Sequence, residues 1–327
     1  MRVLSTVAKG YYGSSIACEP MYLEFTDPLR ALGHEVDHFD HLATRGRFGL
    51  AECGELFVRE VREGGYDVVL YQTSGEDKMP REAVREAGRY APIVAWNSDD
   101  DWQWNSYTKH LCPYFAFMVT TYPDIYDANK KDFPNLRLSQ WGCYDRYADF
   151  GHAKDLDFAF VGKVYGLRQR QCRYLRRKAG LQAYGTGARL VRLGLPWFRG
   201  AQRLPWLSGP PLPLDEVNDI WNRSKVSFTP MEASSDPHLL QIKGRTFEMG
   251  LSGTLMLCQH SPHLERYYEP GKEFVAFEDL DDCAEKADFY LKHETELARI
   301  ARAYHDRTRA EHLWQHRFTK LFQDIGL

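Results

Sequence analysis

Two cations and a carboxylate lie close together in the second half of the sequence. Lys243 and Arg245 are two positions apart, and Glu248 follows three positions later. Cations and free backbone N–H groups bind phosphate oxygens, and a carboxylate can accept hydrogen bonds from the two hydroxyls of a ribose. The turn Ser252-Gly253-Thr254 follows closely and offers further N–H groups. The segment contains the groups that a nucleoside diphosphate site needs, but a Lys-Gly-Arg string is more often a solvated charge cluster, so both interpretations stay open.

Three consecutive carboxylates form a second candidate site. Asp99, Asp100 and Asp101 follow the apolar run Ile93–Trp96. A carboxylate can deprotonate a substrate hydroxyl, and clustered carboxylates raise one another's pKa toward neutral pH. These residues are therefore candidates for a catalytic base. Two alternatives stay open, namely an acidic helix start and an Asp-x-Asp metal site.

Aromatic residues on two loops could contact a second substrate. Tyr11 and Tyr12 follow the first apolar run of the chain, and Trp102 follows the acidic cluster. An aromatic ring offers a large apolar face for stacking, and tyrosine and tryptophan add a polar group. We therefore expect Tyr11, Tyr12 and Trp102 on the acceptor side of a site, with ordinary packing as the alternative.

Composition limits the class of protein. The 327 residues fit two α/β domains better than one core. A net charge of −3 argues against a general nucleic-acid binder. The seven cysteines have no metal-ligand spacing, which predicts reduced thiols and no metal site. No signal peptide and no long apolar run is visible, so a cytoplasmic protein is expected.

Short apolar runs alternate with helical patterns along the whole chain. This pattern predicts parallel sheets with helices on both faces, and ligands then bind beyond the carboxyl ends of the strands. One long helical region is expected from Leu280 to Phe322. The expected strands are Val3–Val7, Glu35–Phe39, Asp67–Tyr71, Ile93–Trp96, Phe115–Thr120, Leu136–Leu138, Asp157–Val161, Leu181–Tyr184, Val226–Thr229, Thr254–Cys258 and Phe274–Phe277.

The segment 189–213 differs from the rest of the chain. Four arginines alternate with Trp197, Phe198 and Trp206, and several prolines prevent a long helix. A plain surface insertion, an acceptor lid and a peripheral membrane contact all fit this composition. Arginine and tryptophan favour the boundary of lipid headgroups, so contact with the inner face of a membrane is one hypothesis.

The last half of the chain resembles a known family. The stretch KGRTFEMGLSGTLMLC is followed by YYEPGKE at 267–273, by Tyr290–His293 and by His312–Arg317. In this order the motifs are similar to the C-terminal half of CgeB-type, spore-maturation-like glycosyltransferases, and so is FVGKVYGLRQR at 160–170. The family has a GT-B fold with a group 1 C-terminal domain. Over the first half of the chain the resemblance is only architectural.

The resemblance implies an architecture and a donor site. It implies two Rossmann-like, doubly wound domains that face a central cleft, with C-terminal helices that cross back. We expect an acceptor domain at 1–150, a donor domain at 151–305 and a terminal helix at 306–327 that packs back toward the first domain. The implied donor-binding residues are Gly162, Arg168, Lys243, Arg245, Glu248, Ser252, Gly253 and Thr254, with Glu248 on the ribose and the cations on the diphosphate.

One position departs from the family pattern. Retaining members of the wider group often carry a glutamate eight positions before the ribose-binding one, and here that position is Leu240. Asp236 and His238 are close but have the wrong offset. Whether the sugar is transferred with retention or inversion therefore stays open.

The sequence thus predicts a glycosyltransferase that moves a sugar from a nucleotide-diphosphate donor to a hydroxyl acceptor. The expected acceptor is a glycan, a lipid-linked glycan, a protein or a small molecule, and a UDP-sugar is the favoured donor. No cofactor, metal or nucleic-acid partner is expected. Two alternatives remain: a sugar-nucleotide epimerase or hydrolase on the same fold, and a non-catalytic nucleotide-sugar binding protein.

Overall fold

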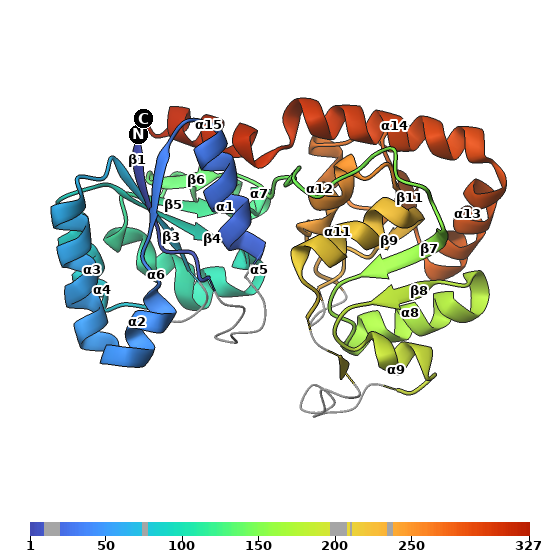
Figure 1. The fold of residues 1–327 in the computed structure, drawn as a ribbon, viewed down its shortest axis with the longest axis horizontal. Coiled ribbons are helices and arrows are strands. Elements are labelled where there is room, and N and C mark those ends of the chain that lie inside the picture. Colours follow the sequence, from blue (N-terminus) through green and yellow to red (C-terminus); the bar gives the residue numbers. More distant parts are fainter. Residues whose placement is uncertain (10–19, 74–77, 197–207, 210, 234–237) are drawn as a thin grey trace. The chain divides into compact units, whose positions relative to one another are not determined.

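The computed structural model of the chain describes all residues except 10–19, 74–77, 197–207, 210 and 234–237. The chain divides into two compact units. Unit 1 contains residues 1–141 and 314–327, and unit 2 contains residues 142–313. Each unit is built around a parallel sheet, as Figure 1 shows.

Unit 1 has a six-stranded sheet in the order β2-β1-β3-β4-β5-β6. Every neighbouring pair is parallel. Buried apolar residues fill most positions of the central strands β3 and β4, because helices cover both faces of the sheet. The strands are β1 (Arg2–Ser5), β2 (Glu35–His38), β3 (Val68–Gln72), β4 (Ile93–Asn97), β5 (Phe117–Thr120) and β6 (Leu136–Leu138).

The two faces of this sheet are covered by different helices (Figure 1). On one face Phe57 of α3 joins Leu4, Val69 and Tyr71 of the strands in a buried cluster. On the other face Phe25 of α1 packs against the rings of strand β4 and helix α15. The helices are α1 (Pro20–Ala31), α2 (His41–Phe48), α3 (Leu50–Gly64), α4 (Arg81–Ala87), α5 (Asp100–Gln103), a π-helix (Trp104–Thr108), α6 (Lys109–Leu111), α7 (Pro123–Asn129) and α15 (Trp314–Asp324).

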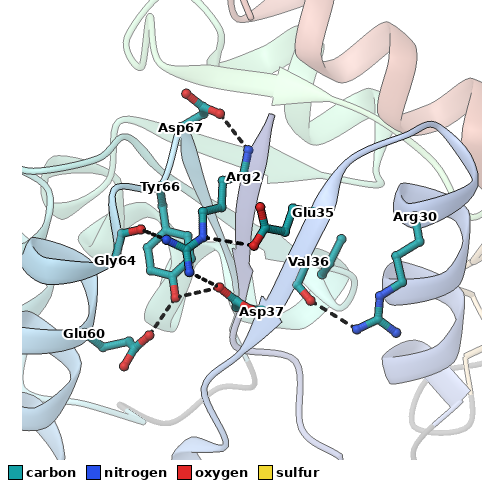
Figure 2. A network of polar contacts seen from close by, with 9 residues as sticks. All are labelled: Arg2, Arg30, Glu35, Val36, Asp37, Glu60, Gly64, Tyr66 and Asp67. Atoms are coloured by element: carbon teal, nitrogen blue, oxygen red, sulfur yellow. Dashed lines mark hydrogen bonds and ion pairs between the residues drawn. The ribbon is translucent and has the colours of Figure 1, made fainter.

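A network of charged and polar groups lies at the amino ends of the strands in the unit 1 sheet (Figure 2). The Arg2 guanidinium donates to Asp37 Oδ2 at 2.8 Å and to the carbonyl of Gly64. The Arg2 backbone N–H donates to Asp67 Oδ2 at 2.6 Å, and Tyr66 donates to Asp37 at 3.1 Å. The network ties β1, β2 and the start of β3 together at the end of the sheet opposite to the expected ligand site.

Unit 2 has a five-stranded parallel sheet in the order β11-β10-β9-β7-β8. The strands are β7 (Leu156–Val161), β8 (Gln182–Tyr184), β9 (Ser224–Thr229), β10 (Leu255–Gln259) and β11 (Val275–Phe277). The helices are α8 (Gly166–Ala179), α9 (Ala188–Arg192), α11 (Leu214–Arg223), α12 (Arg245–Glu248), α13 (Leu280–Lys292) and α14 (Glu294–Glu311), with short 3₁₀ turns at Met249–Leu251 and Leu264–Arg266.

The helical region expected from Leu280 to Phe322 is confirmed and consists of three helices. Asp279 begins α13 by accepting the N–H groups of Asp281 and Asp282. The chain then breaks at His293, and again at His312, where the carbonyl accepts the N–H of Cys143 at 2.7 Å. Helical periodicity continues through both breaks, so the sequence pattern did not reveal them.

Three glycines allow the ends of β7 and β8 to approach each other. Gly162, Gly185 and Gly187 all have positive φ angles, where side chains are strained. A Cβ on Gly185 would lie 2.4 Å from the carbonyl oxygen of Gly162. A Cβ on Gly187 would lie 2.0 Å from the carbonyl oxygen of Val164. The two loops therefore pack backbone against backbone, and only glycine fits at these positions.

Replacing Gly187 should therefore destabilise unit 2. Gly187→Ala combines a positive φ with a clash against rigid backbone, and we expect about 2–4 kcal/mol of lost unfolding free energy. Gly180→Ala is the matched control, because Gly180 also has a positive φ but no atom lies within 4 Å of a Cβ there. Urea denaturation measures both variants. Equal losses in the two variants would contradict the packing argument.

Candidate functional site

The order in which strands are added to the parallel sheet of unit 2 reverses at β7. From β7 the chain first adds β8 on one side, and it then crosses to add β9 on the other side. Loops diverge at such a point and leave room for a ligand beyond the carboxyl ends of the two strands. Gly162 follows β7 directly, and the segment 230–244 follows β9. Sequence elements that are far apart thus meet at one end of the sheet.

Two arginines meet at the carboxyl end of β7. Arg168 comes from α8 and Arg245 from α12, and both guanidinium groups lie over the ring of Phe160, at 5.9 Å and 4.9 Å from its centre. Arg245 also takes the space that a side chain on Gly162 would need, since a Cβ there would lie 2.8 Å from its Nη2. A glycine after β7 is therefore required for Arg245 to reach this position.

The electrostatic environment of the two arginines favours an anion. Burial is the main cause that lowers the pKa of both Arg168 and Arg245, and Arg168 lowers the pKa of Arg245 further. Arg168 Nη1 donates to the carbonyl of Lys163 at 2.9 Å. Arg245 Nη1 is buried and has no hydrogen-bond partner among the residues that the structure describes. A buried donor without a partner is costly, and a bound anion would remove that cost.

Glu248 lies at the end of α12, one helical turn after Arg245. Burial raises the pKa of the Glu248 carboxyl, and the positive charge of Arg245 acts in the opposite direction. Lys243 precedes the helix, and its side chain contacts Gln241. The structure thus brings Gly162, Arg168, Arg245 and Glu248 together around the carboxyl end of β7, with Lys243 on the adjoining segment.

The turn Ser252–Thr254 lies at the opposite end of the sheet. It precedes β10, and Thr254 Oγ1 donates to the carbonyls of Trp221 and Ser224 just before and at the start of β9. Ser252 and Thr254 are fully buried, and Gly253 packs against Phe150. The expected phosphate contacts of Ser252, Gly253 and Thr254 do not fit this placement, because the turn faces the amino ends of the strands.

The three consecutive aspartates Asp99, Asp100 and Asp101 occupy different environments. Asp100 is completely buried and accepts a hydrogen bond from Asn97 Nδ2 at 2.6 Å. Burial raises its pKa to about 6, whereas the neighbouring Asp99 contributes little. Asp99 is exposed, and Asp101 accepts a hydrogen bond from Tyr122. A buried Asp100 does not fit the expected role of a base that contacts substrate, because its carboxylate lacks access.

Of the three expected acceptor residues, the structure describes only Trp102. Trp102 lies in α5, after the carboxyl end of β4, and 59% of its surface is exposed. Tyr11 and Tyr12 lie outside the described residues. Among the residues that the structure describes, no group of three or more His, Cys, Asp and Glu side chains could hold a metal ion.

A family comparison decides the class of enzyme. Residues 168–323 match the model of a family described as glycosyl transferase-like. The protein is a glycosyltransferase. The matched range contains the arginine pair, Glu248 and the loops after β8 and β9. No curated protein sequence matches the chain.

Solved structures show that the glycosyltransferase has a GT-B fold. An alpha-glucosyltransferase in complex with UDP-glucose and abasic-site DNA has a TM-score of 0.66 at 12% identity, with 100% of both chains covered. The Anabaena protein HepE, in complex with UDP and glucose, has a TM-score of 0.65 at 11% identity, covering 100% of this chain and 99% of the other. Sucrose-phosphate synthase from Thermosynechococcus elongatus has a TM-score of 0.63 at 9% identity, covering 99% of this chain and 98% of the other.

Sequence reasoning missed several residues of the glycosyltransferase that shape the polar end of unit 2. The guanidinium groups of Arg168 and Arg245 both lie over the ring of Phe160. Glu232 accepts a hydrogen bond from Gln171 of the same helix as Arg168. Gln171 lies one helical turn after Arg168 and is buried, which a helical projection could have revealed. Glu232 follows β9 closely, and only the strand order shows that β9 lies next to β7.

The buried Asp100 predicts how stability depends on pH. Its pKa is raised in the folded state, so the folded chain binds the proton more tightly than the unfolded chain. The free energy of unfolding should therefore fall by about 3 kcal/mol as pH rises from about 4 through about 6. In Asp100→Asn this contribution is lost, so urea denaturation at pH 4 and pH 7 should show a smaller difference than in wild type.

The control for this measurement is Asp132→Asn, which removes an exposed carboxylate of the same unit. It should keep the pH dependence of wild type. An unchanged pH dependence in Asp100→Asn would contradict a raised pKa at Asp100.

Proposed function

We propose that the carboxyl end of β7 is the donor site of this glycosyltransferase and that Arg168 and Arg245 bind the diphosphate. The enzyme transfers a sugar from a nucleotide-sugar donor. The observation that carries the site assignment is the buried Arg245 Nη1, which lies near a second guanidinium and has no hydrogen-bond partner in the described part of the chain. A diphosphate provides several acceptor oxygens and a negative charge that would offset the repulsion between the two cations.

The remaining donor contacts follow from the same arrangement. Glu248 is proposed to accept hydrogen bonds from the ribose hydroxyls, and Lys243 to face the outer phosphate. Backbone at Gly162 would lie against the diphosphate, because no side chain separates it from Arg245. UDP is the favoured nucleotide, since two similar structures contain UDP-glucose or UDP with glucose.

Charge stabilisation is the proposed catalytic contribution of the donor site. Cleavage of the bond between sugar and diphosphate leaves negative charge on the phosphate oxygens. Two fixed guanidinium groups would stabilise this charge without rearrangement, so the proposed reaction requires no metal ion or other cofactor. The acceptor is proposed to carry a hydroxyl, with Asp99 as the base and Trp102 as a stacking surface, because both are exposed beyond β4. Membership of the CgeB-type group is part of the same proposal.

Loss of Arg245 should weaken nucleotide binding. Titration calorimetry with UDP should give an affinity for Arg245→Ala that is roughly 10- to 100-fold lower than for wild type, because a charge-assisted contact is worth about 1.5–3 kcal/mol. Arg170→Ala is the matched control, since Arg170 is an exposed residue of α8. Equal affinities in wild type and Arg245→Ala would refute the donor-site assignment.

A basic surface of unit 2 supports a second proposal, a peripheral contact with an anionic membrane. Residues 158–214 contain eleven Lys and Arg residues and no Asp or Glu. Exposed Arg170 and Arg177 lie on α8, and exposed Leu193 and Leu195 follow α9. A hydrogen bond of 2.5 Å from Gln169 Nε2 to the Leu195 carbonyl joins the two segments. Basic and apolar side chains together match the boundary of an anionic bilayer.

Part of the predicted membrane segment, including Trp197 and Trp206, lies outside the described residues. No helix among the residues that the structure describes is long and apolar enough to cross a bilayer. The proposed contact is therefore peripheral, and the cytoplasmic face of a membrane is its proposed place.

Vesicle flotation can test this contact. Wild type should float with vesicles that contain phosphatidylserine and remain unbound with pure phosphatidylcholine. The double variant Arg170→Glu/Arg177→Glu should lose about 1 kcal/mol or more of binding for each arginine. Arg299→Glu is the control, because Arg299 is an exposed residue of α14 and lies outside the basic surface. Binding to a short DNA duplex with no binding to the anionic vesicles would contradict the proposal.

A further inference from the structure

A carboxylate lies beside the proposed donor site although the sequence lacks one at position 240. Glu232 follows β9, the strand next to β7 at the point where the strand order reverses. Its backbone forms an isolated antiparallel bridge with Leu240. The two residues of such a bridge point to the same side of the pair, with Cβ atoms about 4.5–5.5 Å apart. A carboxylate at 232 can therefore reach the region that a glutamate at 240 would occupy.

Two further contacts hold the backbone of Glu232 in place. Gln259 is the last residue of β10, and its Oε1 accepts the N–H groups of Met231 at 2.9 Å and Glu232 at 3.1 Å. The N–H of Gln241 donates to the carbonyl of Met231 at 2.8 Å. The loop is thus tied both to the sheet and to the segment that leads into Arg245. A group that must meet a substrate gains from such fixed positioning.

The side chain of Glu232 is oriented by α8. Glu232 Oε2 accepts a hydrogen bond of 2.6 Å from Nε2 of Gln171, which is 6% exposed. The charge of Glu232 acts on Arg168, whose pKa it raises against the larger effect of burial. Glu232 is partly exposed, and only its Oε2 forms a hydrogen bond within the described part of the chain. Its Oε1 can accept a hydrogen bond from a ligand.

We infer that Glu232 accepts hydrogen bonds from hydroxyl groups of the donor sugar and thereby distinguishes a UDP-sugar from UDP. A carboxylate would repel the phosphates, so its ligand must be the neutral, hydroxyl-bearing part of the donor. The arginine pair then binds the charged diphosphate, and Glu232 binds the neutral sugar. This inference rests on the proposed donor site. It assigns to this chain a sugar contact that replaces the side chain missing at Leu240.

Binding measurements can separate this inference from the proposed donor site. Titration calorimetry is carried out with UDP and with UDP-glucose, UDP-galactose and UDP-N-acetylglucosamine. In Glu232→Gln, the affinity for the UDP-sugar that wild type binds most tightly should fall about 10- to 100-fold, which corresponds to the loss of a charged hydrogen bond. The affinity for UDP should stay within about 3-fold of wild type, because UDP lacks the sugar.

Exchanging the two bridge partners provides a stronger test. Glu232→Leu should lose UDP-sugar affinity, and Glu232→Leu/Leu240→Glu should regain most of it, because the carboxylate returns to the facing position. Glu285→Gln, which changes an exposed residue of α13, is the control for a lost negative charge. Melting temperatures close to that of wild type verify folding of each variant.

The possible outcomes are distinct. UDP-sugar affinity that stays unchanged in Glu232→Gln, or that falls together with UDP affinity, would overturn the role of Glu232 in sugar recognition. A folded double variant with no regained affinity would overturn the equivalence of the two positions. Failure of wild type to bind UDP at all would instead refute the donor site on which the inference rests.

Discussion

The repulsion between Arg168 and Arg245 is the constraint on which the carboxyl end of the unit 2 sheet depends. The fold brings both guanidinium groups against one aromatic ring, at a place where burial already disfavours charge. Such an arrangement is costly in the absence of an anion and becomes favourable when one binds. The glycine at 162 is part of the same constraint, because any side chain there would displace Arg245. Stability and ligand affinity are thus coupled at this one place.

Carboxylates around the arginine pair do not simply neutralise it. Glu248 lies on the same short helix as Arg245, and burial raises the pKa of its carboxyl. Glu232 accepts a hydrogen bond from Gln171. The result is a positive centre flanked by hydrogen-bond acceptors. A nucleotide sugar has the complementary pattern, with a charged diphosphate between a ribose and a sugar that both carry hydroxyls.

The two ends of the unit 1 sheet have different chemistry. Ion pairs and hydrogen bonds of Arg2 join β1, β2 and the start of β3 at the amino end (Figure 2). At the other end the exposed Asp99 and Trp102 follow β4, whereas Asp100 turns inward and accepts a hydrogen bond from Asn97. Adjacent residues of one acidic cluster therefore lie in different environments, because Asp100 is buried whereas Asp99 is exposed.

The sequence by itself determined the parallel sheets, since buried apolar runs alternate with helical patterns. It proposed Arg245 and Glu248 as site residues by residue type and spacing, and Arg168 through the family resemblance. It could not show which glycine lies at the carboxyl end of the sheet: Gly162 and Gly253 look alike in sequence, but they follow and precede strands at opposite ends of the sheet. It could not distinguish Asp99 from Asp100, because burial depends on distant parts of the chain. Only the tertiary structure decided that Glu232 faces Leu240, since strand order and pairing across a loop are long-range properties that local periodicity does not encode.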